Sequence, residues 1–276
     1  MIVNKGIFLA LFVLPLCLFS QYTEKIGSGR PGQANGPFGV GKNIYQVQTG
    51  FRLSEVDSEY FIFKLNTEII DNSTMFRIGL FERTELRAGI DYNIRDKFRE
   101  ENTVLQSQSR TSNREERVLN GVSNMSLGIR QNLTQQKKAL PAIGIQATAL
   151  LGGLNDYKTD VVAVQFRLLL QHKITKNLLL NTNLTTATET ENLSYTFSLN
   201  YLITPSIRLV GEMYGVAYFN EVNLEKDVTN NFDFGIGYWI IDNLQVDLFG
   251  GFGYNGSTFR SKFISTGLSY RINRRN

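Results

Sequence analysis

The sequence predicts an all-β chain that forms a transmembrane antiparallel up-and-down β-barrel of about 12 strands. Apolar and polar residues alternate over stretches of about ten to twelve residues, a length that suits a tilted strand crossing a bilayer. The connections between these stretches alternate between short and long, and tyrosines gather near the ends of the stretches. Both features are typical of bacterial outer-membrane barrels.

The composition excludes several classes of protein. The chain has 276 residues, of which 42% are hydrophobic and 20% charged, so it is expected to fold. One cysteine and one histidine are too few for a zinc cluster, an iron–sulfur centre or a disulfide framework, and no metal or cofactor is expected. The net charge of +4 is spread over the whole length, so no basic patch indicates a nucleic-acid partner.

Residues 1–20 are predicted to be a signal peptide. Lys5 precedes an apolar run over residues 6–19, which is shorter than the roughly 20 residues that a membrane-spanning helix needs. An N-terminal membrane anchor is therefore the weaker alternative. Leu16 is too large for the position before a lipidated cysteine, so lipid attachment at Cys17 is not expected.

The segment that follows, residues 21–43, has two alternatives. It either enters the barrel as a plug or hangs in the periplasm as a tail. The sequence does not decide between these two alternatives.

Residues 44–272 are expected to form the barrel, and residues 273–276 a basic tail. In the stretch 193–203 every odd position is apolar or aromatic, whereas the even positions from 194 to 200 are all polar. This period of two is that of a strand and not that of a helix. An even number of strands places both termini on the side of the short connections. The expected strands are 44–54, 74–81, 85–94, 122–133, 140–151, 161–172, 178–188, 193–203, 207–218, 231–241, 244–254 and 261–272.

Two connections need comment. Residues 60–70 also have a strand-like pattern, and we interpret them as a β-extension of the first external loop rather than as a thirteenth strand, because the strand count would otherwise be odd. The loop 95–121 carries six basic and five acidic residues and is expected to be solvated. The short connections are 82–84, 134–139, 173–177, 204–206 and 242–243; the other set is 55–73, 95–121, 153–160, 189–192, 219–230 and 255–260.

The aromatic residues and the last strand indicate a membrane location. Tyrosines on the outward phase lie near both ends of the strands, as in the girdles of membrane barrels. Outward Ile264, Leu268 and Ile272 resemble the terminal signal that the barrel-assembly machinery reads. We therefore expect the bacterial outer membrane as location, with its lipid and the assembly machinery as partners. The tyrosines are Tyr45, Tyr201, Tyr238 and Tyr270 at the periplasmic end, and Tyr92, Tyr195 and Tyr254 at the external end.

The inward phase carries the candidate functional residues. Seven arginines and five carboxylates are expected to line the lumen. They either pair into a network that braces a closed barrel or line a hydrated pore with a weak preference for anions. The set is Arg52, Arg77, Arg87, Arg130, Arg167, Arg208, Arg271, Glu85, Asp91, Glu212, Asp233 and Asp247.

No enzyme chemistry is expected. Residues 36–42 match a phosphate-loop pattern, but Asn43 replaces the required serine or threonine, and no helix follows. Residues 251–256 match a dinucleotide fingerprint within a strand, where no helix dipole is available. A barrel phospholipase would need a serine beside its histidine at the external rim, whereas His172 falls at the periplasmic end. No catalytic, cofactor-binding or metal-binding residue is therefore predicted.

Several segments resemble one bacterial family. They include YQVQTGF at 45–51 and FRIGLFERTELRAG at 76–89, together with 30–33, 40–42, 124–128, 199–205, 210–215 and 267–271. The family is that of the MetA pathway of phenol degradation, whose members are regarded as outer-membrane transporters. The resemblance implies a barrel that passes small solutes passively, with Gln48 standing where a glutamate is usual. A structural or assembly-linked barrel with a closed lumen is the alternative, and a barrel lipase is a weaker one.

Overall fold

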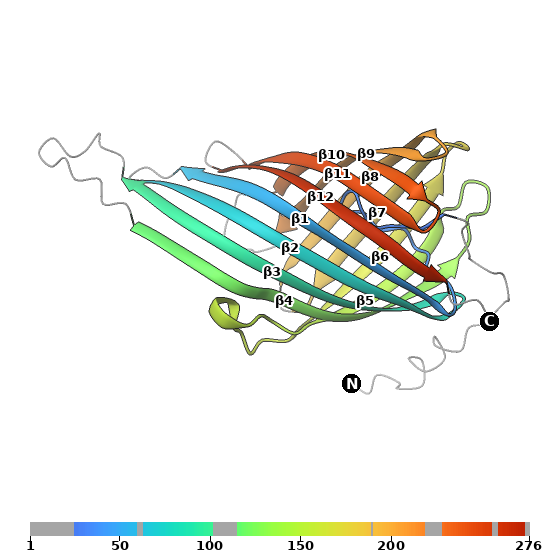
Figure 1. The fold of residues 1–276 in the computed structure, drawn as a ribbon, viewed down its shortest axis with the longest axis horizontal. Helices are drawn as coiled ribbons and strands as arrows, with labels where there is room; N and C mark the ends of the chain where they lie inside the picture. Colours follow the sequence, from blue (N-terminus) through green and yellow to red (C-terminus); the bar gives the residue numbers. More distant parts are fainter. Residues whose placement is uncertain are drawn as a thin grey trace, which may run out of the picture.

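The chain folds into a closed barrel of twelve antiparallel strands (Figure 1). The computed structural model describes residues 25–59, 63–101, 115–188, 190–218, 228–255 and 259–273. The predicted signal peptide and the last three residues of the predicted basic tail lie outside these ranges. The prediction of a twelve-stranded transmembrane β-barrel is confirmed.

Each strand pairs with its neighbours in sequence, and β1 pairs with β12 to close the ring. This last ladder runs in register from the pair Ile44 and Asn273 to the pair Ser58 and Phe259. Every strand therefore has two partner strands, and the ring is closed, although the part of β4 before Ser126 extends beyond its partner β5. The strands are β1 (Ile44–Glu59), β2 (Phe63–Phe81), β3 (Thr84–Glu101), β4 (Glu115–Thr134), β5 (Ala142–Leu150), β6 (Ala163–Lys173), β7 (Leu178–Ala187), β8 (Asn192–Thr204), β9 (Ile207–Tyr218), β10 (Val228–Ile241), β11 (Leu244–Asn255) and β12 (Phe259–Asn273), with a short 3-10 turn, η3 (Asn155–Tyr157), between β5 and β6.

The predicted number of strands is right, but the strands that flank the first two external loops extend further than predicted. Residues 63–70, part of the segment interpreted as a β-extension and not as a thirteenth strand, belong to β2 and pair with the end of β1, whereas residues 60–62 lie outside the described residues. Likewise β3 continues to Glu101 and β4 begins at Glu115, within the predicted loop 95–121. Beyond the bilayer both faces of a strand meet water, so the apolar alternation ends before the strand does.

These extensions make one side of the barrel taller than the other. Strands β1 to β4 have 16, 19, 18 and 20 residues, whereas β5 to β12 have between 9 and 15. In Figure 1 the four long strands project to the left, beyond the rest of the wall. The short turns lie at the opposite end of the barrel.

The distribution of side chains is inverted relative to that of a soluble protein. Phe51, Leu127 and Phe234 on the outer face are 59%, 56% and 62% exposed, whereas Glu85 and Gln245 on the inner face are fully buried. This arrangement is that of a membrane barrel, in which apolar side chains face lipid and polar ones face the lumen.

No helix in the described part of the chain has the length and apolar character needed to cross a bilayer.

Candidate functional site

The twelve predicted lumen residues all lie on the inward face of their strands. Arg52, Asp91, Arg167 and Arg208 are half-buried. The other eight are buried, and they are Arg77, Arg87, Arg130, Arg271, Glu85, Glu212, Asp233 and Asp247.

The lumen also holds part of the chain that precedes the barrel. Residues 25–43, which we call the inner segment, lie inside the barrel toward the short turns, as the blue coil in Figure 1 shows. Ile26, Ala34 and Val40 of this segment are buried. Of the two alternatives for the N-terminal segment, the described residues therefore occupy the lumen rather than the periplasm.

Both ends of the inner segment are attached near the short turns. The backbone N–H of Ile26 donates to the carbonyl of Asp242 at 2.7 Å, and Trp239 Nε1 donates to the Ile26 carbonyl at 3.2 Å. At the other end the N–H of Asn43 donates to the carbonyl of Gly79 at 3.0 Å. Between these points the segment rises into the barrel and returns.

Arg30 is the first deep anchor of the inner segment. Its guanidinium forms an ion pair with Asp247 at 3.1 Å and donates to Ser265 Oγ at 3.0 Å. Its carbonyl accepts hydrogen bonds from Arg208 Nη2 at 2.6 Å and from Gln245 Nε2 at 2.7 Å. One residue of the segment thereby engages three strands, β9, β11 and β12.

Glu212 on β9 is the second deep anchor. Its carboxylate accepts hydrogen bonds from the backbone N–H groups of Gln33 and Ala34, the latter at 3.1 Å. Gly32 precedes this pair with φ of 101°, and a Cβ atom there would lie 2.5 Å from Glu212 Oε1. The close approach of the backbone to the carboxylate therefore requires glycine.

The substitution Gly32→Ala is expected to loosen the inner segment. The added methyl group meets the carboxylate of Glu212, and the positive φ costs about 1–3 kcal/mol in a residue with a side chain. If the segment blocks the lumen, the mean current through the reconstituted protein rises. Gly27→Ala is the control, because a Cβ at Gly27 has no atom within 4 Å. Equal currents in the two variants would show that this turn does not hold the segment.

The segment then crosses to the opposite wall. Asn35 and Asn183 form a reciprocal pair, with the N–H of Asn35 donating to Asn183 Oδ1 and Asn183 Nδ2 donating to the Asn35 carbonyl, both at 2.8 Å. Arg130 on β4 donates to Asn35 Oδ1 at 3.1 Å and to the carbonyl of Phe38 at 3.4 Å. The inner segment thus binds β7 and β4 in addition to β9, β11 and β12.

The final anchor is Glu85 on β3. Its Oε2 atom accepts from the N–H of Val40 at 3.0 Å and from Arg77 Nη2 at 2.7 Å. Its Oε1 atom accepts from Arg77 Nε at 2.9 Å and from Arg87 Nη1 at 3.3 Å. A single carboxylate therefore binds two guanidinium groups and the inner segment together.

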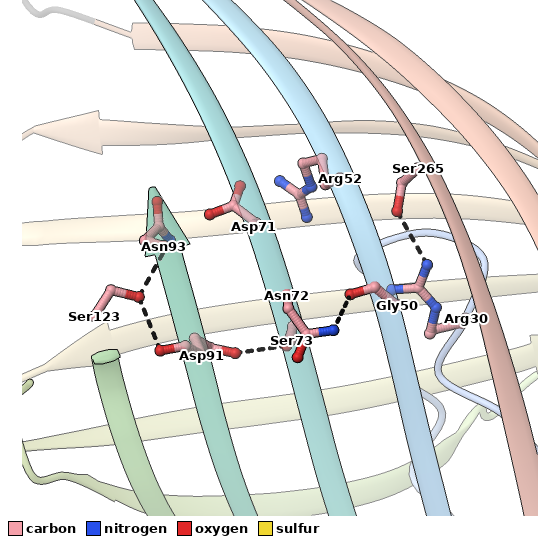
Figure 2. Close-up of a pocket in the computed structure, with 10 residues that line it drawn as sticks. All are labelled: Arg30, Gly50, Arg52, Asp71, Asn72, Ser73, Asp91, Asn93, Ser123 and Ser265. Atoms are coloured by element: carbon pink, nitrogen blue, oxygen red, sulfur yellow. Dashed lines mark hydrogen bonds between the residues drawn. The ribbon is translucent and has the colours of Figure 1, made fainter. Parts of the chain in front are cut away.

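A cavity of about 210 Å³ lies on the long-loop side of Arg30, and we call it the vestibule. Figure 2 shows the basic Arg30 and Arg52 on one side and the acidic Asp71 and Asp91 on the other. Ser73 Oγ donates to Asp91 at 2.5 Å. The walls are therefore polar and carry both signs of charge, and Arg30 of the inner segment closes the space toward the short turns.

His172 lies apart from the lumen. It is on the outward phase of β6, beside a shallow groove lined also by Pro141, Leu170, Leu180 and Thr182. None of the described residues that line this groove is a serine, the nucleophile that the phospholipase alternative requires.

Within the described ranges, no three histidine, cysteine or acidic side chains are grouped closely enough to hold a metal ion. Of the two glycine patterns, residues 36–42 belong to the inner segment, and the described part of 251–256 belongs to strand β11.

Sequence reasoning missed the apolar residues of the lumen. Leu169, Val210, Trp239 and Phe249 face inward and are buried. Phe249 packs under the guanidinium of Arg30, at 5.1 Å from the ring centroid. The alternation places these residues on the inward phase, and that position was the available signal. From sequence alone, however, an apolar residue on the inward phase cannot be distinguished from a lipid-facing residue of a strand whose register is shifted by one position.

Comparison with known proteins shows both family and fold. The COG4313 outer membrane channel from Pseudomonas putida F1 is similar, with TM-score 0.60 and 10% identity over 89% of this chain and 100% of that chain. The translocator domain of the autotransporter NalP from Neisseria meningitidis has TM-score 0.53 and 8% identity, over 84% of this chain and 89% of that chain. The NanC porin has TM-score 0.52 and 8% identity, over 81% of this chain and 100% of that chain.

No curated protein matches the chain in sequence. Residues 28–272 match the family described as "Putative MetA-pathway of phenol degradation". This range includes residues 28–43 of the inner segment and all twelve strands of the barrel, apart from the last residue of β12, so barrel and segment are matched together. The chain therefore belongs to the family of the MetA pathway of phenol degradation.

Proposed function

We propose that the protein is an outer-membrane channel for the passive passage of small polar solutes, and that the inner segment closes it. The observation that carries this proposal is the vestibule, a polar cavity in a barrel lumen that ends on Arg30 of the inner segment. A polar lumen with charges of both signs suits hydrated solutes better than apolar ones.

The proposal that the inner segment is a removable plug rests on the kind of contacts it makes. The deep contacts with the wall are hydrogen bonds and one ion pair, at Arg30, Glu212, Asn183 and Glu85, and only small or single apolar side chains such as Ile26 and Val40 are buried beside them in the described part of the segment. Water can replace each of these contacts one by one when the segment leaves, so the net cost of each exchange is small. A segment held by a large apolar interface would lack this property.

The names of two similar structures, an outer membrane channel and a porin, agree with the proposal. We further propose that residues 1–20 direct export, that the barrel resides in the outer membrane of a Gram-negative bacterium, and that it catalyses no reaction. The alternative, a structural barrel with a permanently closed lumen, predicts that no current flows under any condition.

Planar-bilayer recording of the purified full-length protein tests the proposal. Brief, discrete current steps are expected, because the inner segment leaves the lumen only transiently. A complete lack of current, both in this protein and in a variant without residues 25–43, would support the structural alternative and end the channel proposal.

A further inference from the structure

The wall of the lumen formed by β2 to β6 carries an excess of positive charge. Arg77, Arg87, Arg130 and Arg167, here called the arginine cluster, lie on its inward face. Arg77 and Arg87 are direct cross-strand neighbours, and Gln146 is the cross-strand neighbour of both Arg130 and Arg167. Arg130 is repelled by the other three arginines and attracted by Glu85.

Glu85 does not balance this charge. It forms ion pairs with Arg77 and Arg87. The cluster of four guanidinium groups therefore has a single carboxylate as its counter-charge. Arg130 donates to Gln146 Oε1 and Arg167 donates to Thr185 Oγ1 and Gln165 Oε1, all of which are neutral acceptors.

The inner segment adds no negative charge. It covers the cluster with the carbonyls of Gly27 and Phe38 and the amide oxygen of Asn35, and residues 25–43 contain no aspartate or glutamate. Three positive charges of the cluster therefore remain without an opposite charge among the described residues.

Arg87 has unused capacity to bind a ligand. Its side chain is buried, with 9% of the residue exposed, and its Nε atom has no hydrogen-bond partner among the described residues. The cross-strand neighbour of Arg87 on β4 is Gly128, which is followed in the same row by Thr148 on β5 and Gln165 on β6. Two small residues therefore separate Arg87 from the acceptor that Arg167 uses, which leaves this stretch of wall without a large side chain.

Arg87 lies on the side of the arginine cluster that faces the vestibule. Arg87 lies two residues beyond Glu85 in the direction of the long loops, and Asp91 of the vestibule lies four residues further along β3. Between them stands Gly89, next to Ser126 on β4. Along β3 the order from the vestibule toward the short turns is therefore Gly89, which Met75 flanks on β2, then Arg87, and then Glu85, to which the inner segment is bound.

We propose that the arginine cluster binds one small oxyanion, a carboxylate or a phosphate, between Arg87 and Arg167. Buried charges without partners are costly, so an anion there removes both the repulsion and the unmet hydrogen-bonding need of Arg87. Guanidinium groups present paired N–H donors that match the oxygens of carboxylates and phosphates. The inference deepens the proposed function and rests on it for the role of the anion as transported solute.

Calorimetric titration of the full chain in a neutral detergent measures this binding without requiring transport. Inorganic phosphate and acetate are titrated separately at constant ionic strength, which distinguishes a tetrahedral from a planar ligand. We expect saturable binding of at least one of them at a single site. Arg87→Gln is expected to weaken the affinity by about tenfold or more, since it removes a charge-assisted hydrogen bond. Arg87→Lys keeps the charge and loses the paired donors, so its affinity is expected to lie between that of the unmodified protein and that of Arg87→Gln.

Lys262→Gln is the control, because it also removes one positive charge but lies on the outer face in contact with Glu55. Its affinity should equal that of the unmodified protein. If Arg87→Gln fails to fold, as judged by heat-modifiable migration in gels, Arg167→Gln replaces it. Undiminished affinity in the folded variant, or no saturable binding of either anion to the unmodified protein, overturns the inference. Binding without any current would instead overturn the channel proposal and leave the anion site standing.

Discussion

Removal of residues 25–43 is expected to raise the mean current through the reconstituted barrel by about an order of magnitude, because the polar lumen then offers a continuous aqueous path. The wall itself should survive the deletion. Glu212 and Asn183 lose their partners in the segment, but water fills the opened lumen and hydrates them. Planar-bilayer recording in potassium chloride measures the change.

Two further measurements make this experiment specific. A synthetic peptide of residues 25–43 should restore the block only from the side of the short turns, where both ends of the segment are attached. Trp239 is the single tryptophan of the chain and donates to the carbonyl of Ile26, so its emission should shift to the red when the segment is absent. An unchanged current together with a red-shifted emission would mean that the wall side chains alone close the lumen.

Replacement of Glu85 by glutamine is expected to produce the largest loss of stability. Glu85 is fully buried, and its carboxylate holds Arg77, Arg87 and the N–H of Val40. Removal of its charge leaves buried guanidinium groups without any counter-charge, and breaking a buried ion pair from one side costs about 3–5 kcal/mol. Urea unfolding of the protein in phospholipid vesicles, followed by tryptophan emission, measures the free energy of unfolding.

Glu55→Gln serves as the matched control for this measurement. Glu55 forms an ion pair of the same length, 2.7 Å, with Lys262, but this pair lies exposed on the outer face of the extended strands. The free energy of unfolding should therefore remain that of the unmodified protein. A similar loss in both variants would indicate that any lost carboxylate weakens the barrel, irrespective of its burial.

The twelve strands and the inward phase were predictable because each membrane strand has one face toward lipid and one toward water. In β8, for example, apolar and polar side chains alternate at every position from Leu193 to Asn200. The ends of β2, β3 and β4 were not predictable in the same way. Residues such as Lys97 and Glu68 stand on strands beyond the bilayer, where a charge is equally acceptable on either face.

The path of the inner segment was beyond sequence reasoning for a different reason. Its contacts with Glu212, Glu85 and Arg130 are made largely by backbone N–H and carbonyl groups, which every residue possesses. The sequence therefore left a plug and a periplasmic tail as open alternatives for this segment. Glu85 and Glu212 were identified as lumen charges, but their partners lie 45 and 178 residues away in sequence.

The inner segment can complete its contacts only after the last strands of the barrel are in place. The ion pair between Arg30 and Asp247 joins residues 217 positions apart, and Asp247 belongs to the next-to-last strand. Arg30 also binds Ser265 on the last strand, so its full set of contacts requires that nearly the whole chain has been inserted. A half-built barrel has no complete binding place for the segment. Sealing of the interior is therefore coupled to completion of the wall, and the docked segment is a signature of a barrel whose biogenesis has finished.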